Sequence, residues 1–201
     1  MVIHEILNCF YSPARKGILV IGIDGLGGSG KTTYAKSMEQ TLSNKGIQVK
    51  LLHIDDFIHR NEIRYDDSRA DWECYYYLQW RYDYLIEEIL APVQEGNSID
   101  KQIELYDKQA DQYRLKNIKM APNSILIIEG VFLQRTELAP YFDYVAFIDV
   151  PKEERLQRVL KRDTYIGNDI AIIEKYENRY FPAEDKYIED FSPAERANWL
   201  K

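Results

Sequence analysis

The chain has 201 residues, enough for one domain with a substantial core, and its 45% hydrophobic and 29% charged residues are ordinary for a globular protein. The formal net charge of -7 argues against a nucleic-acid binder, which needs a basic face. Its two separated cysteines suit a reducing compartment. Because no apolar run reaches membrane-spanning length and no basic leader precedes an apolar core, we expect a cytoplasmic protein that does not bind membranes.

Apolar periodicity in residues 1–17 predicts a short leading helix. The apolar, β-branched run over residues 18–24 then predicts a buried strand, and residues 31–44 predict a helix that ends near Gly46. Between them lies a glycine-rich turn. Residues 47–54 predict a second strand, so the chain opens as strand, helix, strand, and a right-handed crossover makes the two strands a parallel pair.

The turn carries a phosphate-binding motif. Gly25, Gly30, Lys31 and Thr32 complete the spacing G-x-x-x-x-G-K-[ST], the P-loop. Backbone N–H groups of such a loop surround phosphate oxygens, the lysine reaches the β- and γ-phosphates, and the threonine hydroxyl ligates Mg²⁺. We therefore predict a nucleotide site formed by Gly25, Gly27, Gly28, Ser29, Gly30, Lys31, Thr32 and Thr33.

Two acidic strand ends are candidate site positions. Asp55 follows the second strand, and Glu129 ends a further buried strand over residues 125–130. The carboxyl ends of parallel strands meet at one edge of the sheet, so both carboxylates should face the P-loop. Asp55 could accept a proton from an attacking hydroxyl or help to hold Mg²⁺, and Glu129 could hold Mg²⁺ with Thr32. The alternative for Asp55 and Asp56 is that they only cap the next turn.

The middle of the chain interrupts the alternation of strands and helices. Residues 59–71 are charged and predict a mobile loop, and residues 72–90 predict one helix, which Pro92, Gly96 and Asn97 end. Asp71 either caps this helix or contacts acceptor hydroxyls. Residues 98–105 predict a strand, paired in a hairpin with residues near 113–115. We interpret the region at about 56–120 as an insertion over the site; its many tyrosines form either a core face or a pocket wall.

The last third of the chain predicts a strand at residues 144–149 and a helix at 151–163. Arg155, Arg158 and Arg162 fall on one face of that helix, either as a solvated surface or as a set that closes over the transferred phosphate. A final helix should run from about Asn168 to Tyr180 and end at Pro182. Together these elements predict one domain over residues 1–201: a three-layer α/β P-loop fold with a mostly parallel central sheet flanked by helices, and a lid region at about 155–170.

These motifs together resemble the uridine kinase and phosphoribulokinase family of P-loop kinases. The resemblance rests on residues 24–32, Asp55-Asp-Phe57, Tyr106-Asp107, residues 128–131 and residues 155–163, in the family's order. It implies an enzyme that transfers phosphate from ATP, with Mg²⁺, to the hydroxyl of a small acceptor, most commonly a ribonucleoside.

Residue by residue, the resemblance makes Asp55 the catalytic base and Lys31 the phosphate-binding lysine. It makes Thr32 and Glu129 the Mg²⁺ shell, and Asp55 is a further candidate ligand from its place at the strand end. Arg158 and Arg162 fall in the lid, and Asp71, Tyr106 and Phe57 fall on the acceptor side, with Asp71 toward ribose hydroxyls.

Two departures from the family pattern bear on the acceptor and the sheet. The chain has no histidine beyond His59 to help read a pyrimidine, and it ends where the family adds a further strand, so that strand should be missing or rudimentary. Nicotinamide riboside, pantothenate or another small alcohol are alternative acceptors. A nucleotide-binding switch ATPase without a small acceptor is an alternative of another class, and assembly into homo-oligomers is left open.

Overall fold

The structure is a computed structural model that describes residues 2–201. Its elements, in chain order, are α1 (Val2–Phe10), β1 (Leu19–Gly25), α2 (Lys31–Ser43), β2 (Val49–His53), η1 (Ile54–Asp56), α3 (Asn61–Arg64), α4 (Asp71–Glu73), η2 (Cys74–Leu78), α5 (Tyr82–Leu85), η3 (Ile86–Leu90), α6 (Ala91–Gln94), β3 (Ile99–Asp107), β4 (Gln112–Met120), β5 (Ile125–Gly130), η4 (Ala139–Tyr141), β6 (Tyr144–Ile148), α7 (Lys152–Arg162), α8 (Asp169–Lys175), η5 (Tyr176–Tyr180), α9 (Phe181–Phe191), α10 (Pro193–Arg196) and β7 (Trp199–Leu200).

The central sheet has five strands in the order β2-β5-β1-β6-β7, and every neighbouring pair is parallel. β1 and β2 run parallel as predicted, but they do not pair with each other because β5 lies between them. The final strand is rudimentary: β7 has two residues and pairs with the end of β6.

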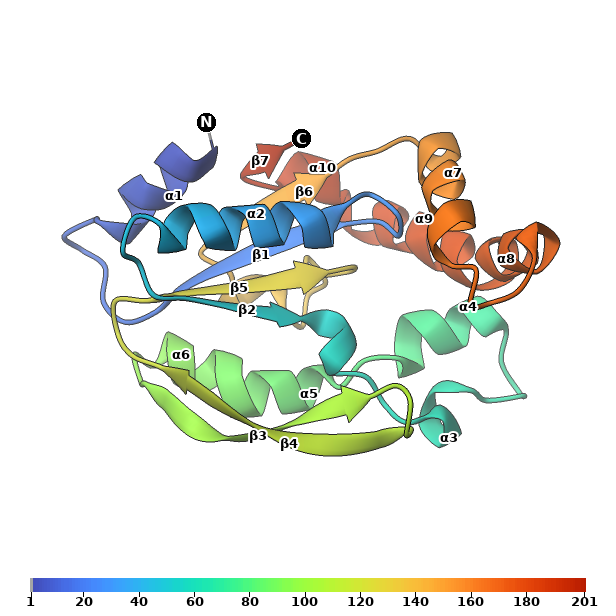
Figure 1. Ribbon diagram of the computed structural model, residues 1–201, viewed down its shortest axis with the longest axis horizontal. Helices are drawn as coiled ribbons and strands as arrows, with labels where there is room; N and C mark the ends of the chain where they lie inside the picture. The colour runs from blue at the N-terminus through green and yellow to red at the C-terminus, as the bar shows by residue number, and fades with distance from the viewer. Residues whose placement is uncertain (1) are drawn as a thin grey trace.

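Helices cover both faces of this sheet (Figure 1). Leu19, Ile21 and Ile23 of β1 pack with α1 and α2 on one face. Val20 packs on the other face, in a core that α5, η3 and α9 complete. Burial on both sides explains why β1 is a continuous apolar run and not an alternating one. The three-layer α/β fold with a mostly parallel sheet is therefore confirmed.

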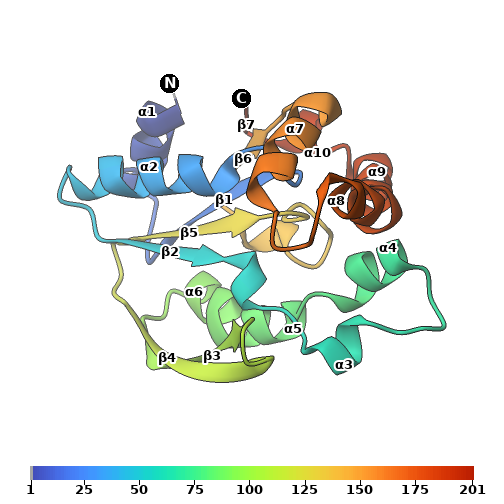
Figure 2. The same ribbon diagram turned by 45° about the vertical axis from the view of Figure 1, so that its right-hand side comes forward.

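The hairpin β3–β4 stands outside the sheet and lies below α5 and α6 in Figures 1 and 2. Ile103 and Ile118 turn their side chains into the core that these helices share with the sheet. Within the segment predicted as a mobile loop, α3 forms a helical turn, and Asp111 of the hairpin accepts a hydrogen bond from the backbone of Asn61 at 3.0 Å.

The prediction of one helix over residues 72–90 is wrong. The helix breaks between Leu78 and Tyr82 because Trp80 forms an antiparallel bridge with Ile58. Arg81 donates its backbone N–H to the Phe57 carbonyl oxygen at 2.8 Å, which fastens the break to the segment after β2. This contact between segments distant in sequence overrides the local helical periodicity.

Pro92 and Pro182 do not end their helices as predicted. Of the three residues predicted to end the first helix, only Gly96 and Asn97 lie beyond its last residue, Gln94. A π-helical turn precedes each proline, and the residue before the proline donates its N–H to the carbonyl five positions back: Ala91 to Ile86, and Phe181 to Tyr176. The wider turn changes the hydrogen-bond register where a proline cannot donate, so the helix continues. The last helix therefore runs through α9 to Phe191.

No helix in the described part of the chain is both long and apolar enough to span a bilayer.

Candidate active site

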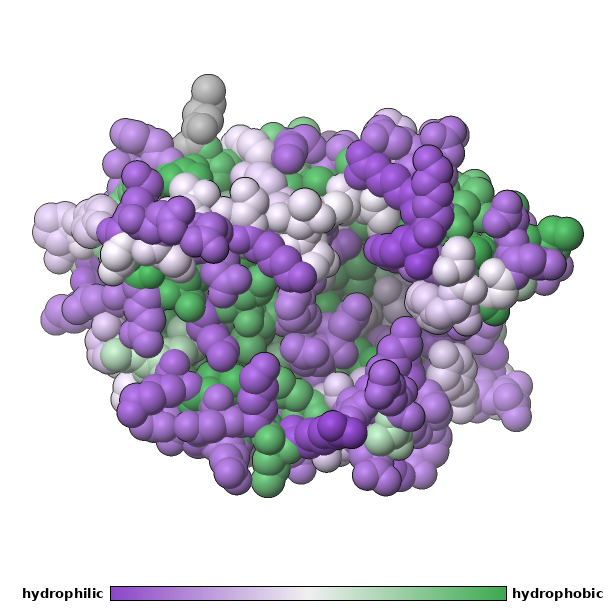
Figure 3. All heavy atoms as spheres, in the orientation of Figure 1, coloured by the Kyte–Doolittle hydropathy of each residue, from purple (hydrophilic) through white to green (hydrophobic). Residues whose placement is uncertain are grey.

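A cavity of about 440 Å³ opens at the carboxyl ends of β1, β2 and β5, and the hollow right of centre in Figure 3 marks its entrance. Its walls come from the P-loop, η1, the end of β5, the segment over residues 58–108 and the α7–α9 region. The residues discussed below that line it are Gly27, Gly28, Lys31, Thr32, Asp55, Asp56, Arg64, Tyr65, Tyr75, Tyr106, Lys108, Glu129, Gly130, Arg162, Asp163, Tyr165, Lys175, Tyr176, Tyr180 and Glu184.

The P-loop has the backbone shape of a phosphate cradle. Gly28 and Gly30 adopt positive φ angles of 80° and 96°, which side chains rarely tolerate. A Cβ on Gly28 would also lie 2.9 Å from the carbonyl oxygen of Arg155. Gly30 precedes α2, and no side chain caps that helix, so its first N–H groups remain available to an anion.

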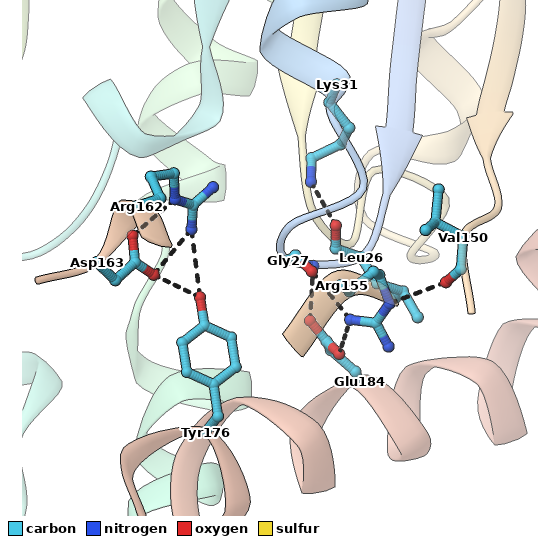
Figure 4. Close-up of polar contacts among 9 residues, drawn as sticks. All are labelled: Leu26, Gly27, Lys31, Val150, Arg155, Arg162, Asp163, Tyr176 and Glu184. Atoms are coloured by element: carbon cyan, nitrogen blue, oxygen red, sulfur yellow. Dashed lines mark hydrogen bonds and ion pairs between the residues drawn. The ribbon is translucent and has the colours of Figure 1, made fainter. Parts of the chain in front are cut away.

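Lys31 is buried at the start of α2, and its Nζ donates to the Leu26 carbonyl oxygen at 2.9 Å (Figure 4). Burial lowers the pKa of this ammonium, and the carboxylates of Glu129 and Asp24 oppose that effect. A buried ammonium among several carboxylates is well suited to receive phosphate oxygens.

Thr32, Glu129 and His53 form a connected group. Thr32 Oγ1 donates to Glu129 Oε1 at 2.9 Å, and His53 Nδ1 lies 2.6 Å from the same oxygen. Burial alone would raise the pKa of Glu129, but the hydrogen bond from His53 and the charge of Lys31 hold it below its ordinary value. A hydroxyl and an ionised carboxylate are hard oxygen donors, so this pair fits Mg²⁺.

The described residues hold no group of three or more His, Cys, Asp or Glu side chains that could bind a metal alone. Mg²⁺ bound to phosphates needs only one or two protein oxygens, so the donor set still fits it.

Asp55 lies in η1, directly after β2, and its side chain is reached by solvent through the cavity. A Cβ on Gly130 would lie 2.0 Å from Ile54 Cγ2, so only glycine there lets η1 pack against the end of β5 and hold Asp55 in the cavity. Enclosure by the cavity walls raises the pKa of Asp55, and the nearby Glu129 carboxylate raises it further. These features are typical of a carboxylate that accepts a proton.

A buried ion pair that no sequence motif indicated lies below the P-loop. Arg155 Nη1 lies 2.7 Å from Glu184 Oε2 of α9, and Glu184 Oε1 accepts the Gly27 N–H at 2.7 Å (Figure 4). Arg155 also donates to the Gly27 carbonyl oxygen at 3.0 Å. Periodicity put Arg155 on a helix face with Arg158 and Arg162, but its partner Glu184 is 29 residues away and belongs to no local motif.

Arg162 and Arg158 point to different places. Arg162 lines the cavity, where it pairs with Asp163 at 2.6 Å and donates to the Tyr176 hydroxyl at 3.2 Å. Arg158 donates to the Ser29 carbonyl oxygen at 3.0 Å and lines a second groove on the other side of the P-loop. That groove also includes Gly30 and Thr33.

Three predicted acceptor-side residues differ in placement. Tyr106 lines the cavity and donates its hydroxyl proton to Asp111 at 2.7 Å. Phe57 is fully buried in the core. Asp71 does not line the cavity; it begins α4, where Ala70 and not Asp71 is the N-cap, and it pairs with Arg179 at 3.3 Å. Gly25, the remaining loop residue, ends β1 and lies against the Ile148 carbonyl oxygen.

This fold and site define a P-loop nucleotide-binding protein of the kinase type. A model of the phosphoribulokinase/uridine kinase family matches residues 20–195. Curated uridine kinases of Staphylococcus aureus and Streptococcus uberis are 28% and 25% identical to the chain over 177 and 178 residues, which is 87% of this chain and 83% and 82% of those proteins. The solved structure of a possible uridine kinase from Bacillus stearothermophilus has a TM-score of 0.79 at 34% identity, over 98% of this chain and 96% of that chain.

The chain therefore belongs to the phosphoribulokinase/uridine kinase family. It is an enzyme, a phosphotransferase with an alcohol group as acceptor.

Proposed function

We propose that this chain transfers the γ-phosphoryl group of ATP, with Mg²⁺, to a hydroxyl of a small metabolite. The observation that supports this most is the meeting of Lys31, Thr32, Glu129 and Asp55 in one cavity, from three different strand ends. A switch ATPase would need the first three residues, whereas a kinase also needs space beside the carboxylate for a small acceptor, and Asp55 faces a cavity of about 440 Å³.

Each residue has a distinct role in this proposal. The P-loop N–H groups and Lys31 bind the β- and γ-phosphates, and the groove beside Thr33 and Arg158 takes the rest of the nucleotide. Thr32 and Glu129 hold Mg²⁺, which neutralises charge on the phosphates. Asp55 accepts the proton of the acceptor hydroxyl as it attacks. Arg162 is placed to balance negative charge on the transferred group, and positioning supplies most of the rate enhancement.

A ribonucleoside is the first acceptor to consider. The relatives named uridine kinases support it, and so do Tyr65, Tyr75 and Tyr180, whose rings line the cavity and could pack against a planar base. Asp71 is the predicted contact to ribose hydroxyls, and it would have to leave Arg179 to make that contact. Nicotinamide riboside and pantothenate remain the alternatives within this function.

Release of ADP in the presence of ATP and Mg²⁺ tests the proposal against a panel of nucleosides, nicotinamide riboside and pantothenate. We expect one acceptor to stimulate release in the wild type and not in Asp55→Asn. Slow hydrolysis that no acceptor stimulates would instead favour the switch ATPase.

A further inference from the structure

The side of the cavity formed by residues 58–108 is called the acceptor end below. It contains a buried arginine that differs from every other buried arginine in the described chain. Four arginines are at least nine-tenths buried: Arg64, Arg135, Arg155 and Arg179, with 9, 9, 4 and 1% of their surface exposed. The last three each have a carboxylate within 4 Å, from Glu137, Glu184 and Asp71. Within residues 2–201, Arg64 has none.

The contacts of Arg64 are all neutral. Its Nη2 donates to the Tyr106 hydroxyl at 2.7 Å and to Asn61 Oδ1 at 2.6 Å. Its Nε is buried and has no hydrogen-bond partner in the described part of the chain. The guanidinium carbon lies 5.3 and 5.1 Å from the ring centroids of Tyr65 and Tyr106. The Asp111 carboxylate is one step removed: it accepts its hydrogen bond from Tyr106 and not from Arg64, and the charge of Arg64 helps to lower the pKa of Asp111.

A buried guanidinium without a carboxylate in direct contact is costly, because burial removes its hydration and the Asp111 charge beyond Tyr106 replaces only part of the lost interaction. Arg64 lines the cavity, so a molecule in the cavity can supply the missing anion. Lys108 and Lys175 line the same cavity, and no carboxylate lies within 4 Å of either in residues 2–201. Arg162, which also lines the cavity, is already paired with Asp163.

ATP is poorly placed to supply this anion. The P-loop separates the cavity from the groove beside Thr33 and Arg158, and in the proposed function the nucleotide lies in that groove and reaches over the loop to Lys31. Arg64 belongs to α3. Figures 1 and 2 show α3 below the central sheet and α2 above it. Asp55, Asp56, Glu129 and Glu184 lie at the P-loop end of the cavity, and Asp163 is paired with Arg162. The cations left at the other end are Arg64, Lys108 and Lys175.

We infer that Arg64 binds an acidic group of the acceptor, so that the substrate is a hydroxylated small molecule that also carries a carboxylate or a phosphate monoester. This inference rests on the proposed phosphotransfer, and it narrows the acceptor. A neutral nucleoside would leave Arg64 unpaired, whereas a nucleoside with an acidic substituent would satisfy both Arg64 and the tyrosine walls.

Matched pairs of acceptors test it: D-glycerate against glycerol, pantothenate against panthenol, and uridine 3′-phosphate against uridine. Among the pairs that react, we expect the acidic member to have a kcat/KM about 10- to 100-fold higher, the value of one or two charged hydrogen bonds. The first two pairs test a carboxylate and the third a phosphate. Equal use of both members, or preference for the neutral one, would overturn the inference without affecting the proposed function.

Three variants assign the preference to the side chain. Arg64→Met should remove the advantage of the acidic acceptor by raising its KM, with the KM for ATP unchanged, and Arg64→Lys should reduce it. Arg60→Met is the matched control, because Arg60 lies four residues earlier, is paired with Glu62 and does not line the cavity. A preference that survives in Arg64→Met, or a loss seen in the KM for ATP instead, would contradict the assignment.

A binding experiment separates the two proposals. With the nucleotide site saturated by MgADP, inorganic phosphate, D-glycerate or pantothenate at millimolar concentration should raise the melting temperature of the wild type and of Arg60→Met, but not of Arg64→Met. If this rise in melting temperature is seen but no acceptor is phosphorylated, the Arg64 site is supported and the proposed function is contradicted. Absence of an Arg64-dependent shift with all three probes would overturn the inference.

Discussion

The two ends of the cavity treat buried charge in opposite ways. At the P-loop end, Arg155 is paired with Glu184, and Lys31 lies among carboxylates, so the folded chain balances its own charges there. At the acceptor end, Arg64 is almost as deeply buried but meets only a hydroxyl, an amide and two rings. A charge that is paired internally fixes the shape of a loop. A charge that is left without a counter-ion is available to a ligand.

The Arg155–Glu184 pair illustrates the first case. Both side chains bond to Gly27, one to its carbonyl oxygen and the other to its N–H, so the P-loop tip is held from below before any phosphate arrives. A preset loop loses little further entropy when the nucleotide binds, which favours tight and well-oriented binding.

The largest effect should come from Lys31→Ala. Removal of the P-loop ammonium leaves the transferred phosphate without its closest positive charge, so we expect turnover to fall at least about 10³-fold and ATP binding to weaken. ADP release and calorimetric binding of ATP measure the two effects. The Arg64-dependent thermal shift should persist in this variant; if it disappears as well, the two ends of the cavity are not independent.

Asp55→Asn should come next. The amide keeps the shape of the carboxylate but cannot accept a proton, so kcat should fall by about 10² to 10⁴, with ATP affinity nearly unchanged. Steady-state kinetics and ATP titration check this. If the variant only lowers the melting temperature, Asp55 has a structural role and none in proton transfer. An equal fall in Asp56→Asn would assign the effect to lost charge in the cavity and not to the base.

Stability measurements sharpen the comparison of the two arginines. Arg155→Met strands the Glu184 carboxylate in the core, so the free energy of unfolding should drop by about 3 to 5 kcal/mol. Arg64→Met strands no charge, and the cost of burying an unpaired guanidinium disappears with the side chain. We expect a change of no more than about 1 kcal/mol in either direction, since the lost hydrogen bonds offset that gain. Urea unfolding without ligand measures both, and equal losses would remove the distinction.

Local patterns predicted the parts of this molecule that local forces determine. The P-loop, the strand ends with Asp55 and Glu129, and the three-layer fold follow from spacing and from apolar runs buried on both faces. The break at Trp80 and the helix that continues through Pro182 do not, because one depends on a bridge to Ile58 and the other on a π-helical turn.

The same limit applies to the site. Glu184 meets Gly27 across 157 residues of sequence, and no spacing rule connects them. Arg64 lies in the segment 59–71, whose sequence predicted a charged, mobile loop and no site residue. Its significance is that no carboxylate in residues 2–201 lies within 4 Å of its guanidinium, which becomes visible only when the neighbours in space are known. Asp71 has a residue type suited to the predicted ribose contact, yet its side chain is 54% exposed and turned to Arg179.

The smallest effect concerns Asp163, which lies between the two ends and is tied to Arg162 and Tyr176. Burial alone would raise its pKa, but hydrogen bonds from Arg162 and Tyr176 hold the pKa below the ordinary 3.8. A lowered pKa favours the folded state above the unfolded-state value, and this stabilisation is lost as the pH falls through 3.8 toward the folded-state pKa. Asp163→Asn should therefore show a shallower loss of stability than the wild type in urea unfolding below about pH 5. The difference should be small, because the Arg162 side chain is 60% exposed and solvent screens the pair. Parallel stability curves for the two proteins would mean that Asp163 keeps an ordinary pKa, and that Arg162 is as free as Arg64 to bind an anion.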